Sequence, residues 1–480
     1  MVLLASIKKY YFLIFICCLF SFFYTLLALV RHSHFGSFGY DLGIVDQITW
    51  KFSTFQLPIT TSDDTPFTLS LVNHFELIYA FLSPLYWIWN DVRFLLVTQA
   101  VFFSFSAIPI FLLAQKYKLK RSLCYALTVC YLTFFGVQNA LWFDVHSAPF
   151  AVAFLSWFIY FVNIGSWKLA ILTFVLCVTA KENYATYIVI TSGMLYVTKR
   201  EKKYLYFAIA GLMYTLFLFG LYFPLFVKGG YHYSQGRSMF SGLNPVDLIN
   251  TQDKRDVFLY SLFSFGFLPL LAPLYLVPFL GNLITYFILG RSVMTAQGLF
   301  LQYRIDLAPL LTLGTILTVV KFKWLNRNLV AIYLLICILG VQYLLHLPLS
   351  YLVKDWFWQE PVAVRSINSM ISEIPPNASV VAQNNILPHL SHRNEIFTLW
   401  PRKKIVHGLG CPDDSCDWLV WAGKPTYLLV DSSSNWDIRH VYTTPKDFEK
   451  AIENVEKKGL IVQYKKDGTT TLFKIIKQSN

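Results

Sequence analysis

The stretch YYFLIFICCLFSFFYTLLALV, from Tyr10 to Val30, decides the fold class. A helix needs about 20 apolar residues to cross a bilayer, and this run supplies them. Lys8 and Lys9 precede it and no small-x-small cleavage site follows, so we expect a retained membrane helix and not a cleaved signal peptide. Hydrophobic residues make up 56% of the 480-residue chain and charged residues only 14%, against about 25% in typical soluble proteins. These proportions exclude a soluble multidomain protein, a disordered chain and a disulfide-rich secreted scaffold.

Further apolar blocks recur along the first three quarters of the chain. They are 94–114, 122–137, 148–164, 168–181, 184–198, 204–226, 258–275, 276–290, 307–320 and 329–346. With the first run they predict a polytopic α-helical membrane protein of about eleven transmembrane helices. The block 75–89 is short and contains Pro84, so we expect an in-plane or re-entrant helix on the outer face.

The distribution of charge predicts the orientation. If the N-terminus is cytoplasmic, the inner segments hold fourteen basic residues and a single acid, Glu201. This bias agrees with the positive-inside rule. An odd number of spans then places the C-terminus outside. The net charge of +13 therefore reflects the expected membrane topology, and no nucleic-acid partner is expected.

The hydropathy changes near residue 355. We therefore predict a membrane domain over 1–355, with a long first outer loop at 31–93, and an extracytoplasmic α/β domain over 356–480. In this tail the patterns predict helices and strands that alternate with turn residues. The helices are expected at 362–374 and 445–458, and the strands at 379–383, 426–431, 460–464 and 470–475. Cys411 and Cys416 fit a short-loop disulfide.

Carboxylates concentrate in the first outer loop. Asp41 and Asp46 lie in the segment YDLGIVDQ, and His74 follows later in the loop. Ionisable groups near a bilayer are costly, so they are candidates for function. A carboxylate there can act as a general base or bind a divalent ion. The alternative is a solvated loop in which an aspartate caps a helix.

A second cluster follows the third span. Asp144 and His146 lie two residues apart on a short outer turn. Together with His74 they predict a shared polar site, in which histidine could serve as a metal ligand or as an acid–base group. Asp41, Asp144 and His146 are the candidate ligands if a divalent metal ion is bound. The alternative is that each histidine has a structural role.

Two further clusters contain cations at the outer ends of spans. Lys181 could bind phosphate as a point charge while Glu182 orients it, or the two could form a local ion pair. Tyr303 and Arg304 precede a later span, and the arginine could clamp a phosphate through two hydrogen bonds. Snorkelling to lipid headgroups is the alternative for both cations.

All four clusters lie on one predicted side, while the spans are almost free of charge. A transporter would be expected to place polar groups near the midplane. The pattern therefore favours a site at the outer leaflet that receives an amphiphile from the bilayer. The sequence contains no P-loop, dinucleotide-binding fingerprint, HExxH helix or nucleophile elbow.

At these residues the chain resembles the bacterial membrane protein family of unknown function 2079 (DUF2079), which is placed in the GT-C glycosyltransferase superfamily. The resemblance covers most of the chain. The segments that carry it are YDLGIVDQ (40–47), NHFELIYAFLSPLY (73–86), Gln99, Pro109, FDVHS (143–147), KEN (181–183), QYRIDLAP (302–309), VVAQNNILPHLSHR (380–393) and Trp400-Pro401. The resemblance implies a GT-C-like, multi-pass protein of the inner (plasma) membrane.

The resemblance also implies a reaction. Members of the superfamily move a sugar from a polyprenyl-phosphate carrier to an acceptor on the outer face, and they rely on an acid in the first outer loop. By position Asp41 is the first candidate for that acid and Asp46 the second. The alternative function is a transporter or flippase of lipid-linked or envelope precursors. A non-catalytic envelope scaffold is a third possibility.

On this hypothesis the other candidates bind substrate. Lys181 and Arg304 would neutralise the phosphate charge that develops during transfer. His389 and Arg393, in the tail segment PHLSHR, would cover the site, or they would form a structural turn. The remaining substrate-binding candidates are His74, Asp144, His146, Glu182 and Tyr303.

Overall fold

A computed structural model describes most of the chain. The described residues are 2–63, 67–227, 231, 245–289, 298–399, 423–433, 435, 437–438 and 444–476, with the backbone alone at 2–9, 73 and 447. The predicted disulfide between Cys411 and Cys416 lies outside these residues.

The chain divides into two compact units. The first comprises Met1–Ala28, Leu71–Ile78 and Leu96–Lys354. The second comprises Leu29–Ser70, Tyr79–Leu95 and Asp355–Asn480. Segments of the first outer loop therefore group with the tail, which the hydropathy pattern did not predict.

The protein is mostly helical, and six helical segments of the described residues are long and apolar enough to cross a membrane. A seventh results if the bent pair α7 (Arg121–Thr133) and α8 (Phe135–Phe143), which meet at 42°, counts as one span. The six segments are Tyr10–Ser33 of α1 (Val2–Ser33), α5–α6 (Arg93–Phe105 and Ala107–Lys116), α9 (Ser147–Ile164), α12–α13 (Lys202–Phe217 and Phe223–Phe226), η10–α16 (Gln302–Arg304 and Leu307–Lys321) and α17 (Asn328–Leu345). The polytopic helical fold is confirmed at this level.

Several predicted blocks form shorter helices. Among them are α10 (Trp167–Ala180), α11 (Tyr184–Lys199) and α15 (Val277–Ile284). The block 258–275 is not one helix, because α14 (Gln252–Phe263) ends inside it and two 3₁₀ turns with Pro269 and Pro273 follow. Proline lacks the N–H that a continuing helix needs. The block 75–89 forms only α4 (Ile78–Leu82) and a 3₁₀ turn (Ser83–Trp87), too short to span.

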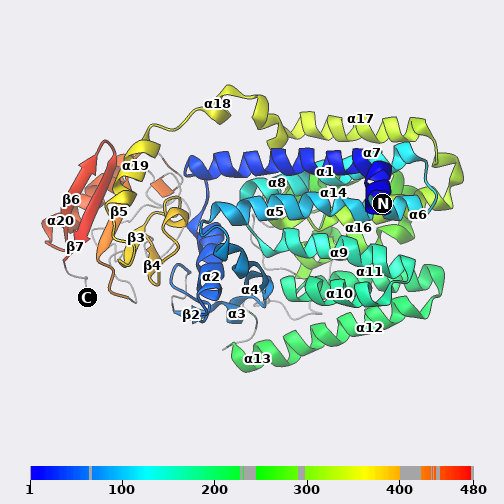
Figure 1. The fold of residues 1–480 in the computed structure, drawn as a ribbon, viewed down its shortest axis with the longest axis horizontal. Helices are drawn as coiled ribbons and strands as arrows, with labels where there is room; N and C mark the ends of the chain where they lie inside the picture. Colours follow the sequence, from blue (N-terminus) through cyan, green and yellow to red (C-terminus); the bar gives the residue numbers. More distant parts are fainter. Residues whose placement is uncertain are drawn as a thin grey trace. The chain divides into compact units, whose positions relative to one another are not determined.

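Helix α16 lies at the centre of the first unit. Its most apolar 18-residue segment is 89% buried within the protein, whereas the corresponding segments of α12–α13 and α17 are 17% and 28% buried. Figure 1 shows α12 and α17 on opposite sides of this unit. A span covered by other helices can hold polar groups that lipid would not tolerate, so the region around α16 is suited to a polar site.

A five-stranded sheet forms the core of the second unit. The strand order is β4 (Ile396–Thr398), β3 (Val380–Ala382), β5 (Tyr427–Asp431), β7 (Thr470–Ile475) and β6 (Ile461–Asp467). Strand β3 pairs in parallel with β4 and β5, whereas β7 runs antiparallel to β5 and β6. Gly468 and Thr469 form the turn that connects β6 to β7.

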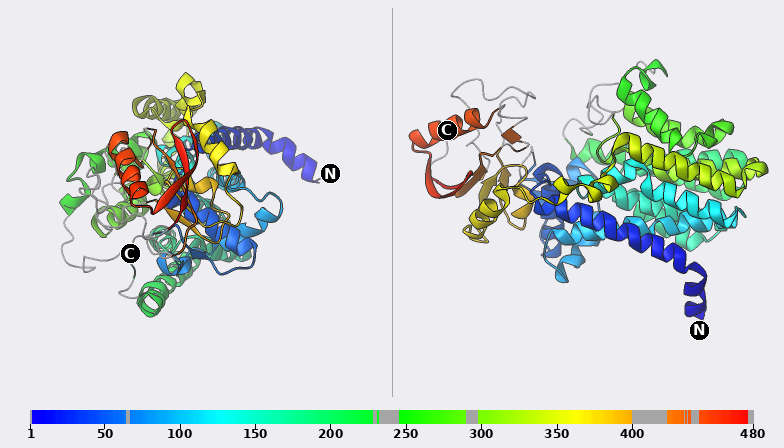
Figure 2. Two further views of the ribbon diagram at one scale, coloured as in Figure 1. Left: turned by 90° about the vertical axis from the view of Figure 1, so that its left-hand side faces the viewer. Right: turned by 90° about the horizontal axis from the view of Figure 1, so that it is seen from above.

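The alternation of side chains gives this sheet two apolar faces. Val381 and Val430 pack with Phe448 of α20 (Pro445–Lys457) on one face. Val380 and Leu429 pack on the other face with α19 (Ala363–Ser372). Successive residues of a strand point to opposite sides, which explains the partition. Figure 2 (left) shows α19 in yellow and α20 in red on either side of the sheet. The predicted tail helices and strands are confirmed, and the short β4 was not predicted.

Candidate functional site

Two short connections between helices lie side by side in the first unit. Lys181, with extended backbone, follows the end of α10, and α11 begins three residues later at Tyr184. Residues 74–77 connect α3 (Ser70–Asn73) to α4. The Leu77 N–H donates to the Thr179 carbonyl at 2.9 Å, and this hydrogen bond links the two connecting segments. Side chains separated by more than 100 residues in sequence thereby become neighbours.

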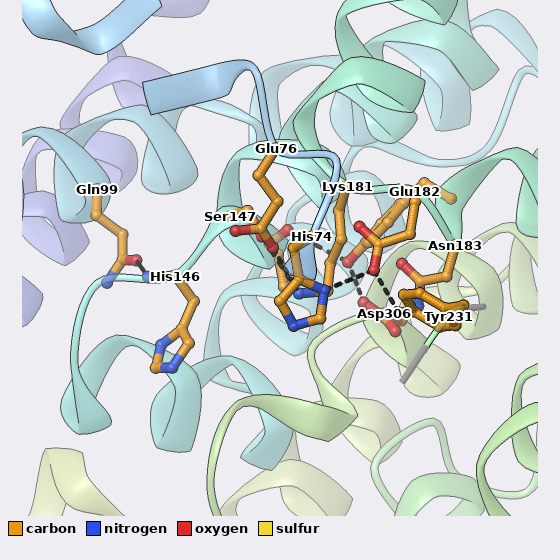
Figure 3. A network of polar contacts seen from close by, with 12 residues as sticks. His74, Glu76, Gln99, His146, Ser147, Lys181, Glu182, Asn183, Tyr231 and Asp306 are labelled. Carbon is orange, nitrogen blue, oxygen red and sulfur yellow. Dashed lines mark hydrogen bonds and ion pairs between the residues drawn. The ribbon is translucent and has the colours of Figure 1, made fainter. Parts of the chain in front are cut away.

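Lys181 forms an ion pair in this region. Its Nζ lies 3.0 Å from Oε1 of Glu76, and Ser147 Oγ, at the start of α9, donates to the same oxygen at 2.6 Å. Lys181 Nζ also lies 3.3 Å from Ser147 Oγ. Figure 3 shows the three side chains converging. Lys181 thus has an ion-pair partner, Glu76, that lies 105 residues away in the sequence, and not only the adjacent Glu182 that the sequence offered.

Glu182 accepts hydrogen bonds from the other side of the cluster. Its Oε1 lies 2.7 Å from His74 Nδ1 and 2.6 Å from the Tyr231 hydroxyl, which donates to it. The side chain is 1% exposed. Its second oxygen, Oε2, is buried and has no hydrogen-bond partner among the described residues. A buried carboxylate oxygen in this state is costly, which marks the position as unusual.

The neighbouring charges keep the acids of the cluster ionised. Burial raises the pKa of the Glu182 carboxyl, but the charge and hydrogen bond of His74 outweigh burial and lower the pKa to about 2. Burial likewise opposes ionisation of Glu76, and Lys181 and His74 lower its pKa overall. Burial lowers the pKa of His74, yet Glu182 and Glu76 raise it above its ordinary value. The cluster is thus a set of mutually dependent charges.

Asp306 adds a third acid. Its Oδ1 accepts a hydrogen bond from the Tyr184 hydroxyl, and its Oδ2 lies 3.3 Å from Asn282 Nδ2 and 3.4 Å from the Tyr286 hydroxyl. The charge of Lys181 acts on Asp306, so the acid belongs electrostatically to the same cluster. Asp306 is fully enclosed by the protein, at 1% exposure.

Arg304, two residues before this acid, is held in place by several contacts. The side chain is fully buried, its Nε donates to the Gly298 carbonyl at 3.2 Å, and its guanidinium faces the rings of Tyr286 and Phe287. Helix α8 approaches the backbone so closely that a Cβ at Gly136 would meet the Arg304 carbonyl oxygen at 2.4 Å. Burial and this contact exclude headgroup snorkelling as the role of Arg304. Tyr303 lies next to it, its ring centroid 5.9 Å from that of Tyr286.

Asp144 and His146 lie in the connection between α8 and α9. Gln99 of α5 bridges the two, since its Nε2 donates to the Asp144 carbonyl and its Oε1 accepts from the His146 N–H, both at 2.9 Å. Figure 3 shows His146 beside Gln99. Asp144 and His146 were predicted as metal ligands. Neither belongs to the group of potential metal-donor atoms found among the described residues, which is formed by His74, Glu76 and Glu182.

The two aspartates predicted as catalytic lie in the second unit. Asp41, half-buried, sits in a short π-helical turn (Gly39–Gly43), and Asn384 of the tail fixes this turn through bonds to the N–H groups of Gly39 and Tyr40. Asp46, in the first turn of α2 (Ile44–Ser53), is fully buried and is not a solvated loop residue.

Asp46 accepts three hydrogen bonds. The donors are the hydroxyls of Tyr86 and Ser391 and the Nε2 of His392, the last at 3.0 Å. Three donors satisfy most of the acceptor capacity of one carboxylate. The arrangement joins the first outer loop to the tail within this unit.

The Asp46–His392 pair predicts a dependence of stability on pH. Burial lowers the pKa of His392, but Asp46, and more weakly Asp91, raise it above the ordinary value of 6.5. Because the folded pKa exceeds the unfolded one, the stabilisation is complete below about pH 6.5 and is lost as pH rises through the folded pKa. We expect a loss of about 1 kcal/mol. Thermal unfolding between pH 5.5 and 9 should show this loss in the wild type and lack it in His392→Gln. An identical pH profile in both proteins would contradict the prediction.

The two tail candidates make structural contacts. The His389 ring stacks on His32 at 4.1 Å, and its burial lowers its pKa well below the ordinary value. Arg393 donates to the carbonyls of Pro375 and Pro376, both at 2.5 Å. These bonds fit the structural turn that was the alternative to a covering role.

The structure brings together His74, Lys181 and Glu182 of the predicted residues. The cluster also contains residues that the sequence analysis did not select: Glu76, Ser147, Tyr231 and Asp306. Glu76 and Asp306 stand inside the segments NHFE and QYRID, so their charge near a span was a usable signal. Ser147 and Tyr231 offered none, because uncharged hydroxyl residues are common in membrane helices and loops.

Comparison with known proteins identifies relatives at two levels. A family model described as "Predicted membrane protein (DUF2079)" matches residues 31–468. Among solved structures, ArnT from Cupriavidus metallidurans in the apo state is similar over 97% of this chain and 98% of its own, with a TM-score of 0.55 and 10% sequence identity. The curated proteins include no match. The likeness to ArnT at this level of identity shows a shared fold.

Proposed function

The chain belongs to the DUF2079 family of predicted membrane proteins, and on this premise we propose that it is a GT-C-type glycosyltransferase of the inner (plasma) membrane. It moves a sugar from a polyprenyl-phosphate carrier to an acceptor on the outer face. The N-terminus is cytoplasmic, and the α/β tail lies outside. The ArnT-like fold supports the class of enzyme, and the orientation rests on the distribution of basic residues.

The observation that carries the proposal is the charged cluster enclosed between the helices of the first unit. Two acids and a lysine, partly or fully buried where helices end, are costly near a bilayer and are therefore candidates for function. Lys181, whose ammonium lies 3.0 Å from Glu76 Oε1, can shift a hydrogen bond to an incoming phosphate oxygen. An anionic lipid carrier is a substrate that such a cation can recognise.

The reaction assigns distinct tasks to the groups. Asp41 takes the proton from the acceptor hydroxyl, or holds a metal ion that activates it. The acceptor oxygen then forms a bond to the anomeric carbon, while the bond from that carbon to the phosphate oxygen breaks. The departing polyprenyl phosphate gains negative charge, which Lys181 and Arg304 stabilise. Attack from the opposite side inverts the anomeric configuration.

Replacing Asp41 by Asn is the test of the assigned base. Membranes with the variant should transfer sugar from a labelled polyprenyl-phosphate donor at least about 100-fold more slowly, because a general base contributes 10²–10⁴-fold. The amide keeps the shape of the side chain, so membrane insertion should not change. Asp63→Asn, in the same loop, serves as the matched control and should retain transfer. Near-normal transfer by Asp41→Asn would refute the assignment.

The products separate transfer from transport. Sugar transfer releases free polyprenyl phosphate and a glycosylated acceptor in equal amounts. A transporter or flippase of lipid-linked or envelope precursors would instead move intact labelled lipid across the membrane. Recovery of translocated but uncleaved donor in reconstituted vesicles would favour that alternative.

A further inference from the structure

The grouping of His74, Glu76 and Glu182 has the geometry of a ligand set. One donor atom from each residue lies within 4.8 Å of the donor atoms of the other two, and His74 Nδ1 and Glu182 Oε1 are 2.7 Å apart. A cation held at about 2.0–2.2 Å by nitrogen and oxygen spaces adjacent ligand atoms by roughly 3 Å. The largest separation therefore exceeds the required one by less than about 2 Å, which side-chain rotation can supply. Figure 3 shows His74 and Glu182 pointing toward each other.

The unused oxygen of Glu182 indicates that the ligand set is incomplete. Oε2 is buried and has no hydrogen-bond partner among the described residues, although its twin oxygen accepts two hydrogen bonds. Leaving a carboxylate oxygen desolvated and unbonded costs free energy. A cation bound by Glu182 would remove this cost.

We propose that His74, Glu76 and Glu182 bind a divalent transition-metal ion. One imidazole nitrogen and two carboxylate oxygens suit Zn²⁺ or Mn²⁺, whereas Mg²⁺ and Ca²⁺ prefer oxygen ligands throughout. Three protein ligands leave at least one coordination position open, as in catalytic zinc sites. A phosphate oxygen can occupy that position next to Lys181. The site differs from the set of Asp41, Asp144 and His146 that the sequence suggested.

Lys181 has a defined relation to this site. Its ammonium lies 3.0 Å from Glu76 Oε1 and so pairs with a carboxylate that the metal ion would also bind. The lysine and the metal therefore compete for Glu76. Removal of the ammonium should therefore strengthen metal binding. If the network were purely structural and bound no metal, the same change would leave metal binding unaltered.

The experiment measures metal binding directly, without reference to sugar transfer. Full-length, tag-free protein in detergent is stripped with EDTA and titrated with Zn²⁺ and Mn²⁺ by calorimetry, and the retained metal is counted by mass spectrometry. We expect one ion per chain. Glu182→Gln and His74→Gln should each weaken binding at least 10-fold, and Lys181→Gln should strengthen it several-fold. The matched controls His146→Gln and Asp144→Asn should bind as the wild type does.

Two results would overturn the proposal. One is the absence of stoichiometric binding by a wild-type protein that unfolds cooperatively. The other is loss of binding in the His146 or Asp144 control with retention in the Glu182 variant, which would move the site to the other set. Thermal unfolding of each variant separates misfolding from loss of a ligand, because a folded variant without its site loses only the metal-induced rise in Tm.

Discussion

Lys181→Gln is expected to reduce sugar transfer at least about 100-fold, the effect of removing one preorganised donor from a developing negative charge. The Lys181 side chain is 21% exposed, and its Nζ lies 3.0 Å from Glu76 Oε1 and 3.3 Å from Ser147 Oγ, so it is held in place while it stays accessible to a phosphate. The measurement is the initial rate of transfer from a labelled polyprenyl-phosphate donor at saturating acceptor. Lys181→Arg keeps the charge and should retain part of the rate.

A double variant separates the two consequences of that change. Lys181→Gln leaves Glu76 without its ion pair, so part of the loss could come from an unbalanced buried charge. Glu76→Gln combined with Lys181→Gln removes both charges and should restore the Tm. Transfer should stay low in the double variant, because the phosphate still lacks its cation. Recovery of transfer together with Tm would show that the pair serves the fold only.

Asp46→Ala is expected to destabilise the second unit by about 3 kcal/mol. The change removes the fully buried carboxylate that accepts from Tyr86, Ser391 and His392, and leaves two buried hydroxyls and a partly buried imidazole without this acceptor. The measurement is thermal unfolding in detergent, with limited proteolysis of the tail as a second readout. Asp46→Asn retains one acceptor oxygen and the volume, so it should cost less.

The same variants test the predicted catalytic role of Asp46. If Asp46 acts only through the fold, transfer in Asp46→Ala should fall with the folded fraction and recover at lower temperature. Ser391→Ala, which removes one donor, serves as the matched control and should have a small effect on both readouts. A variant with wild-type stability and no transfer would instead support Asp46 as a catalytic group.

Local sequence patterns correctly predicted those helices and strands that depend mainly on neighbouring residues. The tail strands at Val380, Tyr427, Ile461 and Thr470 were predicted from alternation and turn residues, because each strand carries its own signal. Strand β4 was missed, since three residues give too short a pattern and its pairing with β3 depends on distant chain. The block 258–275 was hydrophobic enough for a span, but its prolines interrupt the helical hydrogen bonds.

The candidate site was predictable in kind and only partly in membership. Charges near span ends pointed to Lys181, Glu182 and His74, because an ionisable group costs free energy near lipid wherever it lies in sequence. Glu76 carried the same signal but was not selected. The sequence suggested Asp41, Asp144 and His146 as metal ligands, whereas the structure groups His74, Glu76 and Glu182. Spacing along the sequence does not give the distances between side chains in the folded protein.

The sequence by itself determined that this is a multi-span membrane protein with an α/β tail and a net charge of +13. Those properties are sums over residues, so they do not require knowledge of contacts. Only the tertiary structure decided that His74 meets Glu182 across 108 positions, that Lys181 pairs with Glu76 across 105, and that Asp46 is enclosed by tail residues more than 300 positions away. Such contacts depend on where helices break and how they pack, and a one-dimensional pattern does not contain that geometry.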